Sequence, residues 1–322
     1  MNTPSPVKLT LVTASVILCW AYSPIGVHMA LHSYSPGQLA LGRFLIASVL
    51  MAGVALVMRI ERPRLRDLPW LLVLGFFGIF LHHLTINFGQ QFVTAAASSV
   101  LAQSVPLFTV LVAFFALKER VTGWRWGCVL LGLSGVLVVI WGEHGLGEID
   151  PRGLMILVAA LSWSLYFTIQ KHYSRRYSPL TTVCYTVWSG TLLLCVYLPG
   201  LPAVVSQSST QANLAVLLLG AFPSALAYLA WAYVLRHVEV SRASVALYLV
   251  PPVAMVMAAM LLGEQVSLRV VLGGLIVLAS VGAISLEGRW RRKPLRVHGE
   301  HPQAVAVGVL GDKGVAEIRL DR

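Results

Sequence analysis

Long apolar runs without charge dominate the chain and predict its secondary structure. Residues 68–117 and 177–235 contain no Asp, Glu, Lys or Arg. A helix needs about 20 apolar residues to cross a bilayer, so each run is long enough for two crossings. The same criterion along the whole chain predicts ten membrane-spanning helices, at 8–31, 36–58, 69–90, 94–117, 124–141, 153–172, 179–198, 213–235, 243–262 and 268–286.

Other structural classes fit this pattern poorly. Strands of a membrane barrel would alternate apolar and polar residues, and these segments do not. The first segment is too long for a cleaved signal, and nine more follow it. Of the 322 residues, 57% are apolar and 11% are charged, whereas soluble domains carry about 25% charged residues. The four cysteines lie in apolar runs without a CxxC pair, which indicates buried apolar residues rather than a redox or metal set.

The loops carry an uneven distribution of positive charge that predicts orientation. If the N-terminus is cytoplasmic, the inner loops and the tail carry almost all the Lys and Arg residues, and the outer loops carry only Arg152 and Arg269. This asymmetry places both termini in the cytoplasm and the chain in the cell membrane. It also explains the net charge of +11 through contact with anionic lipid headgroups, so no nucleic-acid partner is expected.

The sequence repeats itself once. Residues 34–36 (Tyr-Ser-Pro) recur at 177–179, and Gly75, Pro106 and Glu119 recur 145 residues later as Gly220, Pro251 and Glu264. Each copy holds five spans, and because five is odd the second copy lies inverted in the membrane. We therefore expect an all-α membrane protein with two inverted five-helix repeats around a central cavity, as in secondary transporters. The expected units are 1–143, 152–287 and a basic, poorly ordered tail at 288–322.

Several of these motifs resemble a known family. The stretches 42–47 (Gly-Arg-Phe-Leu-Ile-Ala), 94–99 with 106–108, and 118–120 (Lys-Glu-Arg) are similar to signatures of the EamA family of drug/metabolite transporters. Residues 241–251 and 263–265 resemble the second copy, although Gln265 stands where an Arg is common. The resemblance covers about residues 8–288. It implies ten helices around a central cavity and efflux of small metabolites such as amino acids or nucleosides.

Polar and aromatic residues form stripes on six of the predicted spans. Residues spaced by three, four or seven positions share a helix face, and polar groups in hydrocarbon are costly unless they face protein or a wet cavity. Close helix packing or interfacial anchoring is the alternative interpretation for some of them. The predicted substrate contacts are Trp20, His83, Asn87, Gln103, Trp163, Tyr166, Tyr228, Trp231 and Tyr248.

Prolines inside spans predict hinges. Proline removes a backbone donor and bends a helix, and a cavity can hydrate the freed carbonyl groups. The predicted hinge or gating positions are Pro24, Pro106, Pro223, Pro251 and Pro252. Glu119 and Glu264 follow their helices at the membrane edges, where they would cap neighbouring helix N-termini, pair with Arg or act in gating.

Three basic or titratable residues lie well inside spans. Arg43 is about seven residues from the outer end of its span. It would either reach the outer interface or capture a substrate carboxylate at the outer mouth. His82 and His83 are adjacent and point about 100° apart, so at most one faces the cavity fully. Helix packing, substrate contact and proton coupling are all open for them. No metal site is expected, because neither HxxxH spacing nor an intramembrane carboxylate accompanies the pair.

The sequence lacks the motifs of the main enzyme classes. It contains no GxxxxGK, HExxH or GxSxG, so neither ATP-driven transport nor hydrolysis is expected, and no cofactor is implied. The predicted function is export of a small amphipathic metabolite by alternating access, with substrate and membrane lipids as partners. A membrane sensor or lipid-handling protein is the alternative, and the chain is compatible with a monomer or a homodimer.

Overall fold

The computed structural model describes residues 5–116, 118–144, 151–173, 176–238 and 246–290. Within these ranges every regular element is helical. Nine helical segments are long and apolar enough to cross a membrane, and Leu247–Leu262 is a shorter tenth. The expected ninth span began at residue 243, so its first residues lie outside the described ranges. The nine are Pro6–Leu31, Pro36–Met58, Leu65–Gly89, Ala95–Phe115, Gly123–Trp141, Pro151–Gln170, Pro179–Tyr197, Thr210–Val234 and Leu268–Ser285.

The second and seventh spans begin with the same local sequence and the same cap. Ser35 and Ser178 have extended backbones, and their hydroxyls accept hydrogen bonds from backbone N–H groups three residues on, at 3.3 and 3.1 Å. Each serine is followed by a proline, whose fixed φ and missing N–H suit the first helical position. The repeated Tyr-Ser-Pro sequence is therefore a helix start, used once in each half for α2 (Pro36–Met58) and α9 (Pro179–Leu194).

Four of the spans are interrupted, and the interruptions match by the 145-residue repeat. In the third span a π-helical turn, η2 (Phe76–Leu81), separates α3 (Leu68–Gly75) from α4 (His82–Gly89). In the eighth span η6 (Phe222–Leu226) separates α11 (Thr210–Ala221) from α12 (Ala227–His237) in the same way. Such turns add a residue to a helical turn and often mark functional sites.

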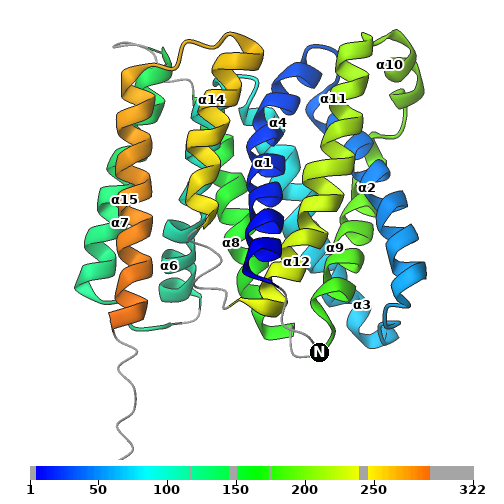
Figure 1. Cartoon of the computed structure of the whole chain (residues 1–322), viewed down its shortest axis with the longest axis horizontal. Coiled ribbons are helices and arrows are strands. Elements are labelled where there is room, and N and C mark those ends of the chain that lie inside the picture. Colours follow the sequence, from blue (N-terminus) through cyan, green and yellow to red (C-terminus); the bar gives the residue numbers. More distant parts are fainter. Residues whose placement is uncertain (1–4, 117, 145–150, 174–175, 239–245, 291–322) are drawn as a thin grey trace, which may run out of the picture.

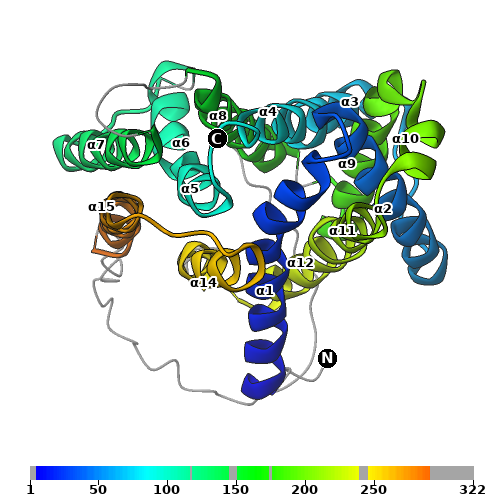
Figure 2. The same cartoon turned by 90° about the horizontal axis from the view of Figure 1, so that it is seen from above.

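The fourth and ninth spans share a different interruption. A 3₁₀ turn, η3 (Ala102–Ser104), lies between α5 (Ala95–Leu101) and α6 (Val105–Phe115). The turn η7 (Leu247–Leu249) precedes α14 (Val250–Leu262) at the equivalent position. Pro106 and Pro251 come two residues after these turns, and Pro252 follows directly. Pro223 lies inside η6, and Pro24 lies inside α1 (Pro6–Leu31). All the predicted hinge prolines therefore lie in or beside a helical irregularity except Pro24, although Figure 2 shows α1 changing direction along its length.

Helix packing follows the two-fold repeat. The helix α1 packs against α11, α12 and α14, and its counterpart α8 (Met155–Tyr173) packs against α4 and α6. Likewise α2 packs on α11, and α9 packs on α3. The last helices of the halves, α7 (Gly123–His144) and α15 (Leu268–Trp290), pair with each other at one edge of the bundle (Figures 1 and 2). The two halves thus enclose a core built from both.

Glycines at repeat-equivalent positions allow the closest helix contacts. A Cβ atom at Gly75 of α3 would lie 2.5 Å from the backbone nitrogen of Gly190 in α9. At Gly220 of α11, a Cβ atom would lie 2.7 Å from the carbonyl oxygen of Arg43 in α2. Small residues let helices in membranes approach to backbone contact, where van der Waals packing holds them together.

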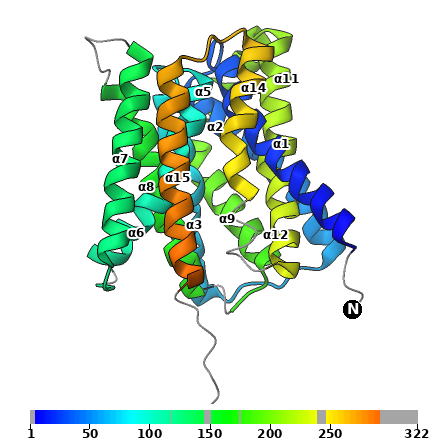
Figure 3. The ribbon, with the colours of Figure 1, turned by 60° about the vertical axis from the view of Figure 1, so that its left-hand side comes forward.

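The outside of the bundle is apolar. Leu56, Val57, Leu130 and Met260 are between 65% and 81% exposed, as expected for side chains that face lipid tails rather than water. The start of α1 and the end of α15 lie at the same end of the bundle, and α7 and α15 stand side by side in a second view as well (Figures 1 and 3). This arrangement puts both ends of the ten-span region on one face.

Candidate functional site

Aromatic side chains from both halves meet in the interior of the bundle. The indole of Trp163 in α8 lies 4.0 Å from the imidazole of His82 and 6.3 Å from the phenol ring of Tyr228, measured between centroids. The ring of Trp20 in α1 lies 6.2 Å from Tyr228 and 5.7 Å from Trp231. We call this set the central aromatic cluster; its members are Trp20, His82, His83, Trp163, Tyr166, Tyr228 and Trp231.

The two π-helical turns position this cluster. His82 directly follows η2, and Tyr228 comes two residues after η6. The irregular turn η6 also leaves a backbone carbonyl available to a side chain. The indole N–H of Trp20 donates a hydrogen bond to the Pro223 oxygen at 3.3 Å. The distortion at the same place in each repeat therefore directs the third and eighth spans toward a shared centre.

Arg43 borders the central aromatic cluster and is buried. Its side chain is 2% exposed, and its Nε donates to the hydroxyl of Ser224 in η6 at 2.9 Å. A second guanidinium nitrogen is 3.5 Å from the hydroxyl of Ser23 in α1, and the guanidinium carbon lies 5.4 Å from the centre of the Phe44 ring. Arg43 thus lies below the surface, where α1, α2 and η6 meet, and its predicted place at an outer mouth stays a prediction.

Several polar atoms in the interior of the bundle are buried without a hydrogen bond from the described residues. Both ring nitrogens of His83 and the hydroxyl of Tyr228 belong to this group, as does Oδ1 of Asn87. His82 differs, because its Nδ1 donates to the carbonyl oxygen of Ala159 at 2.9 Å. An unpaired buried polar atom costs free energy, so a group of them at one place is typical of a site that binds a ligand.

The structure brings together most, but not all, of the predicted contact residues. Asn87 lies one turn beyond His83 on α4, and its amide nitrogen donates to the Pro36 oxygen at 3.0 Å. Tyr248 points to α15, where its hydroxyl is 2.6 Å from the Ser285 hydroxyl. Gln103 lies in η3, is half-buried and forms no hydrogen bond with another described residue. Neither residue is a member of the central aromatic cluster as defined above.

Two neighbours of the cluster were not among the predicted contacts. The Phe44 ring lies 4.5 Å from the His83 ring, with the two planes tilted by 56°, and Phe44 follows Arg43 directly. Ser224 shares a helix face with Tyr228 four residues later, which is the one signal in the sequence that could have found it. Phe44 gave no such signal, because a phenylalanine in an apolar span is indistinguishable from a lipid-facing one.

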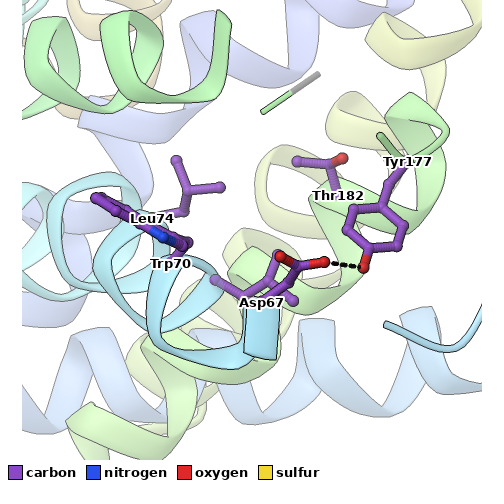
Figure 4. Close-up of a pocket in the computed structure, with 6 residues that line it drawn as sticks. Asp67, Trp70, Leu74, Tyr177 and Thr182 are labelled. Atoms are coloured by element: carbon purple, nitrogen blue, oxygen red, sulfur yellow. Dashed lines mark hydrogen bonds between the residues drawn. The ribbon is translucent and has the colours of Figure 1, made fainter. Parts of the chain in front are cut away.

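A pair of tyrosines links the two halves at opposite ends of the bundle. Tyr34, just before α2, donates a hydrogen bond to the side-chain oxygen of Asn213 in α11. Its repeat counterpart Tyr177 donates to Oδ2 of Asp67, before α3, at 2.6 Å, and Arg176 pairs with the other oxygen at 2.8 Å. Figure 4 shows this contact, with the Tyr177 phenol directed at the carboxylate beside a small pocket lined by α3 and α9.

One of the two repeated glutamates caps a helix. The carboxylate of Glu264 accepts hydrogen bonds from the backbone N–H groups of Ala95 and Ala96 at 2.9 and 3.1 Å, at the start of α5. Gly263, with φ of +67°, ends α14 in the left-handed conformation and turns the chain toward that position. Glu119 is exposed, and the residues equivalent to Ala95 and Ala96 in the second half lie outside the described ranges.

The site offers no metal-binding group within the described residues, where no three His, Cys, Asp or Glu side chains gather. What it offers instead is a set of aromatic faces, several hydroxyl and imidazole groups, and one buried cation. This combination suits the binding of a small organic molecule with an apolar part and a polar part.

Comparison with known proteins gives consistent matches. The model of the EamA-like transporter family matches residues 8–141 and 152–286. The uncharacterized transporter YdfC of Bacillus subtilis is 32% identical over 85% of this chain and 90% of its own length. A probable terminal-alkyne amino-acid exporter of Streptantibioticus cattleyicolor is 31% identical, over 86% and 93%. The probable amino-acid metabolite efflux pump of Escherichia coli is 24% identical, over 86% and 94%. A crystal structure with 18% identity superposes with a TM-score of 0.59 over 90% of this chain and all of its own, which shows the shared fold.

Proposed function

The chain belongs to the EamA-like transporter family, and on this basis we propose that it is a secondary transporter that exports a small amphipathic metabolite across the cell membrane. An amino acid or a related compound is the substrate class that we favour. Membership of a transporter family also points away from an enzyme, in agreement with the missing catalytic motifs.

The observation that carries the proposal is the central aromatic cluster. Its members come from both halves, with Trp20 and His83 from the first and Trp163 and Tyr228 from the second. A ligand held there would contact both halves at once. Relative motion of the halves would then change the access to the ligand from one side of the membrane to the other.

The chemistry of the cluster supports an amphipathic substrate. Each aromatic ring that covers an apolar part of the ligand contributes about 1–2 kcal/mol through buried area. Unpaired polar atoms of His83 and Tyr228 are available for hydrogen bonds to the polar part. Two relatives carry names that refer to amino-acid export, which supports the same substrate class.

The packing of the cluster implies that binding requires motion. Tyr228 and Tyr166 are 9% and 4% exposed, and their rings are in contact with Trp163, so a substrate enters only when these side chains separate. The tyrosine contacts to Asn213 and to Asp67 join the halves at opposite ends of the bundle. Breaking one contact while the other stays closed would open one side at a time.

The hinge prolines give a direct test of this motion. Replacing Pro106 or Pro251 by alanine would restore a backbone donor beside the 3₁₀ turns and favour a straight helix. We expect turnover to fall more than membrane abundance in both variants. Unchanged flux in both would contradict a role of these turns in the transport cycle.

The experiment that tests the function is a flux assay. The purified protein is reconstituted into liposomes, and efflux of labelled amino acids is followed with and without a pH gradient, with empty liposomes as the control. Transport predicts efflux that saturates with substrate concentration. Saturable binding without flux would instead identify a sensor, and lipid movement without amino-acid flux would identify a lipid-handling protein.

The same assay tests proton coupling. If His83 carries the coupled proton, a pH gradient accelerates flux in the wild type, and His83→Asn abolishes this acceleration while exchange between equal pools persists. If the gradient has no effect on the wild type, the transporter is a uniporter or an exchanger. Alanine at Gln103 or Tyr248, which are not members of the cluster, tests whether the substrate path extends to η3 and η7.

A further inference from the structure

Arg43 carries a buried charge that no carboxylate among the described residues neutralises. Among the described residues its side-chain partners are the hydroxyls of Ser224 and Ser23, and no carboxylate lies within ion-pair distance. Hydroxyl groups satisfy donors but do not compensate a full charge. A buried charge without a counter-ion costs several kcal/mol, and such residues in membrane proteins commonly mark sites of function.

No acidic residue of the chain lies inside a predicted span. All 13 Asp and Glu residues lie at the ends of the predicted spans, in the loops or in the tail. Asp67 is already bonded to Arg176 and Tyr177, and Glu264 to the start of α5. A ligand carboxylate would supply the counter-ion that Arg43 lacks among the described residues.

The groups around Arg43 form the rest of an anion site. The Tyr228 ring lies 6.3 Å from Trp163, which is itself 6.1 Å from His83, and the Tyr228 hydroxyl is buried without a hydrogen bond. Phe44 lies between the guanidinium, at 5.4 Å, and the His83 ring, at 4.5 Å. Both nitrogens of His83 are unbonded. Guanidinium, phenol and imidazole are all donors, and a carboxylate has two oxygens to accept from them.

We propose that Arg43 binds the carboxylate of the transported metabolite and that the substrates are monocarboxylates with an apolar side chain. The planar guanidinium matches the two carboxylate oxygens, and the central aromatic cluster next to it covers the apolar part. An amino group on the substrate would lie on the aromatic faces of Trp20 or Trp163 rather than on a protein carboxylate. This inference rests on the proposed transport function, because it assigns the substrate class of the same site.

The test compares acids with their uncharged amides. Thermal unfolding of the full-length purified protein is measured with L-phenylalanine, L-leucine and phenylacetate, and with the three corresponding primary amides. We expect each acid that binds to have an affinity at least about tenfold above that of its amide, because only the acid pairs with the guanidinium. In Arg43→Gln this preference disappears, whereas Arg269→Gln, an exposed arginine at the start of α15, retains it.

If Arg43→Gln does not fold, Arg43→Lys provides the test in its place. The lysine retains the charge but loses the two parallel donors, so we expect weaker binding of the acids and unchanged binding of the amides. An equal affinity of acids and amides in the wild type, or an acid preference that survives in Arg43→Gln or is unaltered in Arg43→Lys, would overturn the proposal and show that Arg43 is a structural cation.

The flux assay separates this inference from the function on which it rests. Flux of amino acids without any preference for the acid over the amide would overturn the carboxylate site and leave transport standing. A preference for acids that depends on Arg43, without flux, would leave the binding site standing and overturn transport.

Discussion

Alanine at Gly75 or Gly220 is expected to destabilise the protein to a similar degree, because the two positions are equivalent in the two repeats. A Cβ atom at Gly75 would lie 2.5 Å from the Gly190 nitrogen, and one at Gly220 would lie 2.6 Å from Cβ of Ile46. Both obstacles are backbone or the base of a side chain, so neither can turn away. The helices themselves must separate.

The magnitude follows from the distances. Ordinary contacts of a Cβ atom begin at 3.4 Å, so α3 must move about 0.9 Å from α9, and α11 about 0.8 Å from α2. Overpacking of this kind costs about 1–3 kcal/mol. Alanine gains up to about 1 kcal/mol over glycine in helix propensity, which offsets part of that cost. Because three atoms lie within 2.8 Å of each Cβ position, the cost falls in the upper part of its range, about 2–3 kcal/mol, and the net loss of stability is about 1–2 kcal/mol for each variant.

The assay is the apparent melting temperature of the purified protein in detergent. At roughly 2–4 °C for each kcal/mol, we expect both variants to melt several degrees below the wild type. Gly53→Ala is the matched control, since a Cβ atom there meets nothing within 4 Å, and it should melt at or above the wild-type temperature. If Gly75→Ala and Gly220→Ala both melt like the control, the close helix contacts and the reasoning from repeat equivalence are refuted.

Three further predictions concern the cluster, the cap and the links between the halves. Trp163→Ala should weaken the apparent affinity for substrate about tenfold in the flux assay, because it removes a ring worth about 1–2 kcal/mol; a full wild-type affinity would exclude this ring from the site. Glu264→Gln should cost about 1 kcal/mol of stability by weakening the charged cap of α5, whereas the exposed Glu119→Gln should change little in the same melting assay. Tyr177→Phe should destabilise the protein more than Tyr34→Phe, because Tyr177 donates to a carboxylate and Tyr34 to a neutral amide oxygen; an equal loss would show that the charge does not matter.

The helical architecture could be predicted from the sequence because it depends on two local patterns, the long uncharged runs and the repeated helix start. Long runs without charge predict membrane spans. The repeated Tyr-Ser-Pro sequence predicts the start of equivalent helices, since serine at the N-cap followed by proline is typical of a helix N-terminus. The odd number of spans in each repeat then fixed the inverted relation between the halves. The matching turns η2 and η6 agree with this relation.

The site was predictable only in part, because helix faces were assigned with a regular period of 3.6 residues. The π-helical and 3₁₀ turns change that period inside four spans, so residues beyond them point in directions that regular spacing does not give. Tyr248, within η7, consequently faces Ser285 instead of the cluster. The buried side chain of Arg43 donates a hydrogen bond to the hydroxyl of Ser224, which lies in η6. That contact joins residues 181 positions apart and leaves no local signal.

We propose that the substrate binds between the two halves at the central aromatic cluster. The position of a bound photoreactive amino acid tests this most directly. The reconstituted protein is incubated with photo-leucine, irradiated and digested, and the labelled peptides are identified by mass spectrometry, with excess L-leucine as competitor. We predict competed labels on α8 and α12, near Trp163 and Tyr228. Labels confined to lipid-facing residues of α7 and α15, or labels that excess L-leucine does not reduce, would contradict it.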